Sequence, residues 1–191
     1  MSNEDWYRND TWNDEIESQF MAKLKRARRK EQYLRIQASY LATNNPNVAI
    51  KLLAQYFELK DDFDHAQAYC DYATAYISLG DIEKAISNYA LALKREKIFP
   101  NLVTEAYVLY PLTIVKYEFI SSYSDANKVL EENFDRLSFP LDHFRWHASK
   151  AIIEKQLGNH EVSSSHAARA LDAAEIKKSG FRFHQKLGLV G

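Results

Sequence analysis

The chain has 191 residues, of which 46% are hydrophobic and 27% charged, and its formal net charge is −1. Five glycines and four prolines are too few for a turn-rich all-β fold, and the mix is typical of a globular domain or a short repeat array. The balanced charge excludes a global field that favours nucleic acid or an anionic membrane, and the single Cys70 excludes an internal disulfide and a cysteine-rich zinc site.

The amino-terminal residues MSNEDWYRND are polar and acidic, so we expect no signal peptide. No apolar run reaches about 18 residues, so we expect no transmembrane helix. Together these features predict a cytoplasmic protein without a membrane partner.

A first helix is predicted over residues 12–28, where Ile16, Phe20 and Leu24 recur at helical spacing. Its first half is acidic and its second half is basic, which suits the helix macrodipole. Its apolar stripe is expected to cover the exposed end of the helices that follow, so residues 1–29 are interpreted as an amino-terminal segment with a capping helix.

A basic run follows this stripe and gives six candidate polyanion contacts: Lys23, Lys25, Arg26, Arg28, Arg29 and Lys30. One interpretation is contact with nucleic acid or another polyanion. The other is a solvated helix end whose cations pair with nearby carboxylates. The near-neutral net charge and the lack of a second basic block favour the second interpretation.

Residues 30–63 are predicted to form a pair of helices. Tyr33 and Tyr40 lie on the packing face of the first helix, and Ala49 lies at the small position of the second. Asn44-Asn45-Pro46 forms the turn, because proline fits the first turn of a helix.

Residues 66–96 carry the clearest pattern, in which aromatic and small residues alternate at helical spacing on both sides of a Gly80-Asp81 break. The residues of the two packing faces are Tyr69, Tyr72, Ala73, Tyr76, Ala85, Tyr89, Ala92 and Leu93. Small residues let two helices cross closely, and the large residues fill the gaps between them.

This order of aromatic residue, Gly-Asp, alanine, tyrosine and Ala-Leu resembles the tetratricopeptide repeat (TPR). The resemblance extends over residues 30–174, with Ala49, Ala85, Ala126 and Ser163 at the close-packing position of successive second helices. It implies an all-α fold, a short right-handed solenoid of antiparallel helix pairs with about nine helices.

The third and fourth pairs are expected over residues 101–137 and 140–176, as weaker copies. Pro111 starts or kinks a helix of the third pair. In the fourth, Gly158-Asn159 matches the earlier Gly-Asp turn. Residues 177–191 are too apolar for a free tail and are expected to dock on the last pair or on a partner.

In TPR proteins the first helix of each pair lines a concave groove, so the resemblance implies a groove here. The candidate groove residues are Leu34, Ala38, Leu41, Gln67, Cys70, Thr74, Ile77, Val115, Glu118, Phe119, Arg145, Ile152 and Lys155. They are mostly apolar or small, and they lack the Lys/Asn/Arg set with which chaperone-binding members hold a terminal carboxylate. This lining favours an apolar helix or extended segment, unless the weaker repeats close the groove and part of the set is core.

Candidate chemical groups are few. His143 and His147 are spaced to share one helix face, but two ligands do not make a zinc site and no HExxH pattern is present. Cys70 is interpreted as a partly buried apolar group. We therefore expect no catalytic residue, no metal and no cofactor.

The sequence thus predicts a non-enzymatic scaffold or interaction module that binds a protein or peptide in a concave helical groove. The alternative is a regulatory TPR protein that responds to nucleic acid or a nucleotide ligand through the basic amino-terminal helix. A third hypothesis is an enzyme that uses His143 and His147. The repeat ends and the apolar tail leave homo-oligomer formation open.

We expect Ala85→Trp to lower the free energy of unfolding by several kcal/mol, because an indole cannot fit where two helices cross closely. Thermal unfolding of the purified variant followed by circular dichroism measures this effect. An unchanged melting temperature would contradict the predicted helix register.

Overall fold

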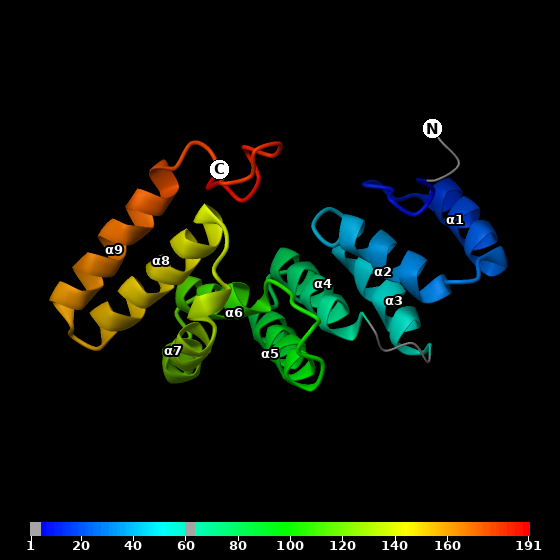
Figure 1. The fold of residues 1–191 in the computed structure, drawn as a ribbon. Coiled ribbons are helices and arrows are strands. Elements are labelled where there is room, and N and C mark those ends of the chain that lie inside the picture. The colour runs from blue at the N-terminus through cyan, green and yellow to red at the C-terminus, as the bar shows by residue number, and fades with distance from the viewer. Residues whose placement is uncertain (1–4, 60–63) are drawn as a thin grey trace. The chain divides into compact units, whose positions relative to one another are not determined.

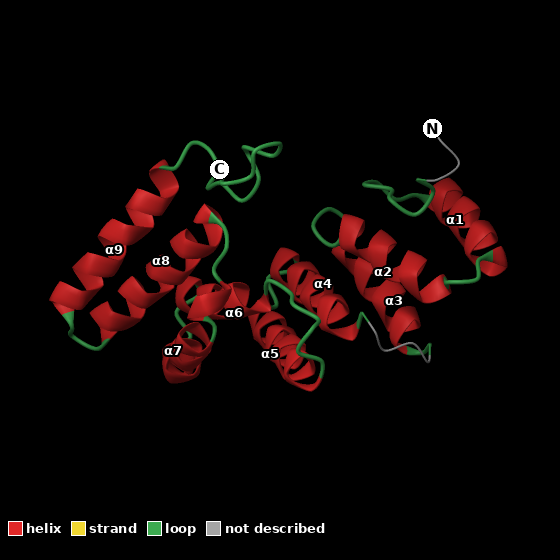
Figure 2. Cartoon of the chain, viewed as in Figure 1, coloured by secondary structure: helices red, strands yellow, loops and turns green. Residues whose placement is uncertain are grey.

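The computed structural model describes residues 5–59 and 64–191, and this part of the chain contains nine α-helices, two short 3-10 helices and no strand (Figure 1). Figure 2 shows that turns and irregular segments connect these helices. The prediction of an all-α chain with about nine helices is confirmed. Within the described ranges, no helix combines the length and apolar character that crossing a bilayer requires. The chain divides into two compact units, residues 1–106 and 107–191.

The amino-terminal unit contains five helices, each packed against its neighbour in the chain. They are α1 (Asp14–Arg26), α2 (Lys30–Leu41), α3 (Pro46–Phe57), α4 (His65–Ser78) and α5 (Ile82–Ile98). The first helix is shorter than predicted, because the side chain of Asn13 caps it by accepting the N–H of Ile16 at 2.9 Å. This packing between consecutive helices is consistent with a helical solenoid.

The small residues that the sequence assigns to helix crossings are buried in this unit. Ala49 of α3 and Ala85 of α5 are both fully buried, with 0% exposure. Leu52, Leu53 and Tyr56 complete the buried face of α3. The alanines therefore allow a close approach that a larger side chain would prevent.

The predicted aromatic face of α4 forms a ladder of rings with α3. The ring of Tyr72 stacks on Phe57, with centroids 5.6 Å apart, and on Tyr76, with centroids 6.0 Å apart. Tyr69 also contacts Phe57, at 4.9 Å between centroids. These tyrosines thus join consecutive helix pairs, because ring contacts of this kind add to the burial of apolar area.

The segment before α1 is held to α2 by a buried amide. The Oε1 atom of Gln37, a residue with 0% exposure, accepts hydrogen bonds from the backbone N–H and side-chain amide of Asn9 at 3.1 and 2.8 Å. Its Nε2 atom donates to the carbonyl of Asn9 at 2.7 Å. The ring of Trp6 contacts those of Phe20 and Tyr33, so this segment and α1 together cover the first helix pair.

A second polar contact joins α2 to α4. The guanidinium of Arg35 lies 3.3 Å from a carboxylate oxygen of Asp64 and 3.3 Å from one of Asp71. Gln67 donates to the other oxygen of Asp71 at 3.2 Å. Burial nevertheless raises the pKa of Asp71 to about 6, because desolvation of the carboxylate outweighs these contacts.

The carboxy-terminal unit contains most of α6 (Ala106–Lys116), followed by α7 (Tyr123–Glu132), α8 (Pro140–Gln156) and α9 (His160–Glu175). Two 3-10 helices, Ile120–Ser122 and Phe134–Arg136, flank α7. The indole N–H of Trp146 donates to the carbonyl of Leu130 at 2.8 Å and joins α8 to α7. Ala126 is fully buried at the small position of α7, whereas Ser163 of α9 is half-buried and donates its hydroxyl to the carbonyl of Ala151 at 2.8 Å.

The helix α6 decides between the two alternatives for Pro111 and differs from the expectation at its end. Pro111 lies inside the helix and not at its start. The helix ends at Lys116, so the candidate groove residues Glu118 and Phe119 lie in the following turn.

The last residues of the chain contact the start of α8. The N–H of Leu141 donates to the carbonyl of Gly188 at 2.8 Å, and the ring of Phe181 stacks on Phe139 at 5.3 Å between centroids. Phe183 is 85% exposed, so the tail buries only part of its apolar surface.

Three helices end in the same type of turn. The N–H groups of Asp81, Phe119 and Asn159 each donate to the carbonyl five residues earlier, at 2.9, 3.0 and 2.9 Å, as in a Schellman motif. The residue before each of them has a positive φ: Gly80 at 77°, Glu118 at 58° and Gly158 at 82°. Glycine adopts this conformation readily, whereas glutamate adopts it at a cost.

We expect Glu118→Gly to raise the free energy of unfolding by about 0.5–1 kcal/mol, because it removes the steric penalty of a left-handed glutamate. We expect Gly80→Ala to lower it by about 1 kcal/mol, since no atom lies within 4 Å of the added Cβ and only the backbone penalty acts. Chemical denaturation followed by circular dichroism measures both. Destabilisation by Glu118→Gly would show that contacts of the glutamate side chain stabilise the fold by more than its left-handed backbone conformation destabilises it.

Candidate interaction site

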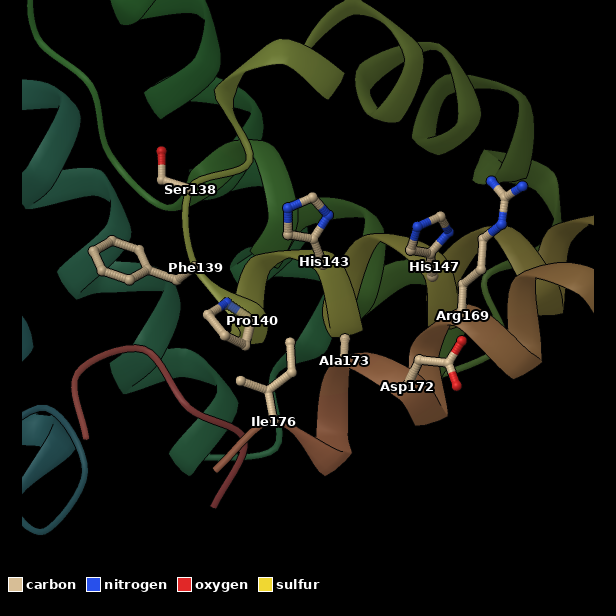
Figure 3. A pocket seen from close by; sticks show the side chains of 9 residues that line it. All are labelled: Ser138, Phe139, Pro140, His143, His147, Arg169, Asp172, Ala173 and Ile176. Carbon is tan, nitrogen blue, oxygen red and sulfur yellow. The ribbon is translucent and has the colours of Figure 1, made fainter. Parts of the chain in front are cut away.

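A pocket lies between α8 and α9 in the carboxy-terminal unit (Figure 3). Its volume is about 310 Å³. Its lining, hereafter the α8–α9 pocket, consists of Ser138, Phe139, Pro140, His143, His147, Arg169, Asp172, Ala173 and Ile176. Such a volume is at the small end of the range for ligand pockets and suits one or two side chains.

Four apolar side chains form one wall of the pocket. Phe139 and Pro140 come from the start of α8, and Ala173 and Ile176 come from the end of α9. The buried carboxylate of Asp142 holds the start of α8 in place, because it accepts the backbone N–H of Phe139 at 3.1 Å. The apolar wall is therefore positioned by the end of α9 on one side and by the capped start of α8 on the other.

The opposite end of the pocket is polar. His143 and His147 of α8 and Arg169 and Asp172 of α9 line it, and Figure 3 shows the side chain of Arg169 extending beside His147. Among the described residues, no ion pair includes Arg169 or Asp172. The two charges are therefore available to a ligand that carries complementary groups.

A pair of histidines joins the two helices behind this end. The Nδ1 atoms of His147 and His166 are 2.9 Å apart, so one of them carries a hydrogen and donates it to the other. Burial, with the charges of His166, Arg169 and His143, lowers the pKa of His147 to about 4. Burial also lowers the pKa of His166, with contributions from Lys150 and Arg169. Both imidazoles are thus neutral at pH 7.

The prediction that His143 and His147 share one face of a helix is confirmed, since both line the pocket. The described ranges hold no group of three or more histidine, cysteine, aspartate or glutamate side chains that could bind a metal ion. The arrangement provides an apolar wall, two charged side chains and neutral imidazoles. It is therefore suited to binding an apolar group that has a polar end.

Sequence reasoning missed Phe139, Arg169, Asp172 and Ile176, although the sequence contains part of the necessary information. In an antiparallel helix pair, residues equally far from the turn lie opposite each other. Measured from Gly158, Pro140 corresponds to Ile176, His143 to Ala173, and His147 to Arg169. Pairing residues across the predicted turn would have placed Ile176 and Arg169 opposite Pro140 and His147, whereas Phe139 and Asp172 do not follow from this pairing.

Several candidate groove residues of the amino-terminal unit are part of its core. Leu34, Ala38 and Leu41 are at most 3% exposed and belong to one buried cluster. Gln67 and Thr74 are half-buried, with hydrogen bonds to Asp71 and to the carbonyl of Cys70, respectively. Ile77 is half-buried as well.

Cys70, which was expected to be partly buried and to line the groove, is a buried thiol with 5% exposure. Its Sγ atom donates to the hydroxyl of Thr104 at 3.4 Å, and the carboxylate of Glu96 accepts the hydroxyl of Thr104 at 2.5 Å. Burial raises the pKa of Cys70 to about 12. The thiol is therefore protonated at pH 7 and is not a nucleophile in this environment.

In the carboxy-terminal unit the candidate groove residues lie outside the pocket. Val115 is 3% exposed and contributes to packing. Ile152 and Lys155 are exposed on α8 and Arg145 is half-buried, but none of them lines the α8–α9 pocket.

The six predicted polyanion contacts all lie where α1 ends and α2 begins, and all six are exposed. We call Lys23, Lys25, Arg26, Arg28, Arg29 and Lys30 the cationic corner. The side-chain ammonium of Lys23 lies 6.0 Å from the ring centroid of Trp6.

Comparisons with protein-family models, curated protein sequences and solved structures give no match to this chain.

We expect acid to weaken the contact between α8 and α9. The pKa values of His147 and His166 lie below the usual 6.5, so the unfolded state binds more protons than the folded state between pH 6.5 and 4. The free energy of unfolding therefore decreases as the pH is lowered through this interval. Replacing both by phenylalanine removes this contribution and should flatten the dependence of the melting temperature on pH.

The exposed His184→Gln is the control, since it also removes an imidazole. The pH dependence of the double variant must be compared with that of the wild type and the control. Asp71 has a raised pKa, so its contribution to stability decreases as the pH rises from 4 to 6, opposite to that of the histidines. Equal pH dependence in the double variant and the wild type would contradict the assignment.

Proposed function

We propose that the chain is a TPR-type, non-enzymatic interaction module that binds a protein or peptide, with an apolar side chain of the partner in the α8–α9 pocket. The observation that carries the proposal is the combination of an apolar wall with Arg169 and Asp172, which have no ion pair among the described residues. A peptide offers both an apolar side chain and polar backbone groups close to it. The pocket suits that combination.

The repeated architecture supports the TPR assignment. Ala49, Ala85 and Ala126 are fully buried at the positions where the family needs small residues. The turns at Gly80 and Gly158 use the same hydrogen bonds and the same positive φ. A helical module of this kind presents side chains from rigid elements, which limits the entropy lost on binding.

The pocket also suggests how a partner is held. Burying one leucine- or phenylalanine-sized side chain contributes about 1.5–3 kcal/mol, and a few such anchors dominate most interfaces. Arg169 and Asp172 would fix the direction of the peptide by contacting its polar groups. The exposed Ile152 and Lys155 of α8 are available to residues of the partner outside the pocket.

A displayed library of random peptides, selected for binding to the full chain, tests this proposal. We expect the selected peptides to share an apolar residue and to lose about tenfold or more in affinity for Ile176→Glu, because a carboxylate is placed in the apolar wall. Leu171→Glu is the matched control, since Leu171 lies on the same helix, is exposed and does not line the pocket.

Circular dichroism should show both variants folded, because Ile176 and Leu171 are 42% and 64% exposed. Failure to select any peptide would count against an interaction module of this type. Equal loss of affinity in the two variants would place the binding surface outside the α8–α9 pocket.

A further inference from the structure

The cationic corner is a strongly charged surface that the α8–α9 pocket does not involve. It includes the last turn of α1, the three residues that link α1 to α2, and the first residue of α2. Its six side chains are exposed, and no ion pair of the described residues includes any of them. The expectation that nearby carboxylates neutralise this run therefore has no support in the structure.

Three other cations of the chain are used differently. Arg35 contacts two aspartates, Lys84 lies 2.6 Å from Asp81, and Lys150 contacts two glutamates. These cations hold elements together or cap them. The cationic corner has no such contacts, so folding does not account for the clustering of its charges.

Helix electrostatics explain only half of the corner. Lys23, Lys25 and Arg26 lie in the last turn of α1, where positive charge is favourable. Arg29, however, is the N-cap residue of α2 and Lys30 begins the helix, where positive charge is unfavourable. Arg29 also makes no capping hydrogen bond with its side chain, although aspartate, asparagine or serine would. The sequence thus places cations where they cost stability.

Charges that reduce stability and remain exposed point to recognition of an external group. We propose that the cationic corner binds an acidic segment of a protein partner, a short run of aspartate and glutamate residues. Arginine guanidinium groups form paired hydrogen bonds with carboxylates, and three of the six cations are arginines. An extended run of about four acidic residues spans roughly 13 Å.

The charge pattern of α1 favours an acidic peptide over nucleic acid. The first turn of this helix carries Asp14, Glu15 and Glu17, all of them exposed. A helix of 13 residues is about 20 Å long, so a nucleic acid that continued along α1 would meet these carboxylates. A short acidic segment ends before it reaches them.

The test compares two fluorescent probes, a peptide with four consecutive glutamates flanked by glycine and serine residues and a single-stranded oligonucleotide of ten thymidines. Fluorescence anisotropy at low salt should show that the wild type binds the peptide more tightly than the oligonucleotide. Affinity for the peptide should fall as salt rises, because exposed charges are screened.

The test variant is Arg28→Gln combined with Arg29→Asn and Lys30→Gln. We expect it to lose about tenfold or more in affinity for the peptide, since three charge-assisted contacts are removed. Its melting temperature should equal or exceed that of the wild type, because asparagine is a better N-cap than arginine. A purely structural role for these cations predicts a lower melting temperature.

The control combines Lys51→Gln, Lys94→Gln and Lys178→Gln, three exposed lysines whose replacement changes the net charge equally. Equal loss of peptide affinity in the test and control variants would overturn the site. Tighter binding of the oligonucleotide would overturn the proposed partner in favour of nucleic acid. Neither result tests the α8–α9 pocket, which is tested separately by Ile176→Glu and its control Leu171→Glu.

Discussion

Close crossing of paired helices at small residues is the constraint on which the rest of this structure depends. Two backbones approach closely only where the side chains between them are small, and Ala49, Ala85 and Ala126 meet that condition with no exposed surface. Where the position holds Ser163 instead, its hydroxyl donates to the carbonyl of Ala151. Close crossing fixes the register of each pair, and in the last pair the register brings the start of α8 beside the end of α9, where the two helices together form the apolar wall of the pocket.

The same constraint explains which parts of the fold the sequence predicts. Gly80 and Gly158 are recognisable because glycine is favoured at a positive φ, and both turns occur where expected. Glu118 adopts the same positive φ, but it is not a glycine and so gives no sign of a turn in the sequence. For this reason the predicted helix continued past the true end of α6, and Phe119 was assigned to a helix face. The first candidate groove residues, Leu34 and Ala38, were assigned from the family's register, which gives a helix face but not how deeply its neighbours bury it.

The candidate site was harder to predict, because it depends on contacts between helices. The spacing of His143 and His147 indicated a shared face, whereas the hydrogen bond between His147 and His166 arises only after α9 folds back on α8. The low pKa of His147 has the same origin, since burial is its main cause. The cationic corner, in contrast, is evident in the sequence, and the structure adds that its charges are unpaired among the described residues and partly opposed to a helix dipole.

The buried thiol of Cys70 has a consequence for studying the dynamics of the amino-terminal unit. It is the only cysteine of the chain, it lies on α4 within the core, and its pKa is about 12. Alkylating reagents react with the thiolate, so the folded chain is nearly inert to them at neutral pH. The rate at which a maleimide modifies the native protein therefore measures how often α4 is exposed by local opening, and it does so without any engineered label.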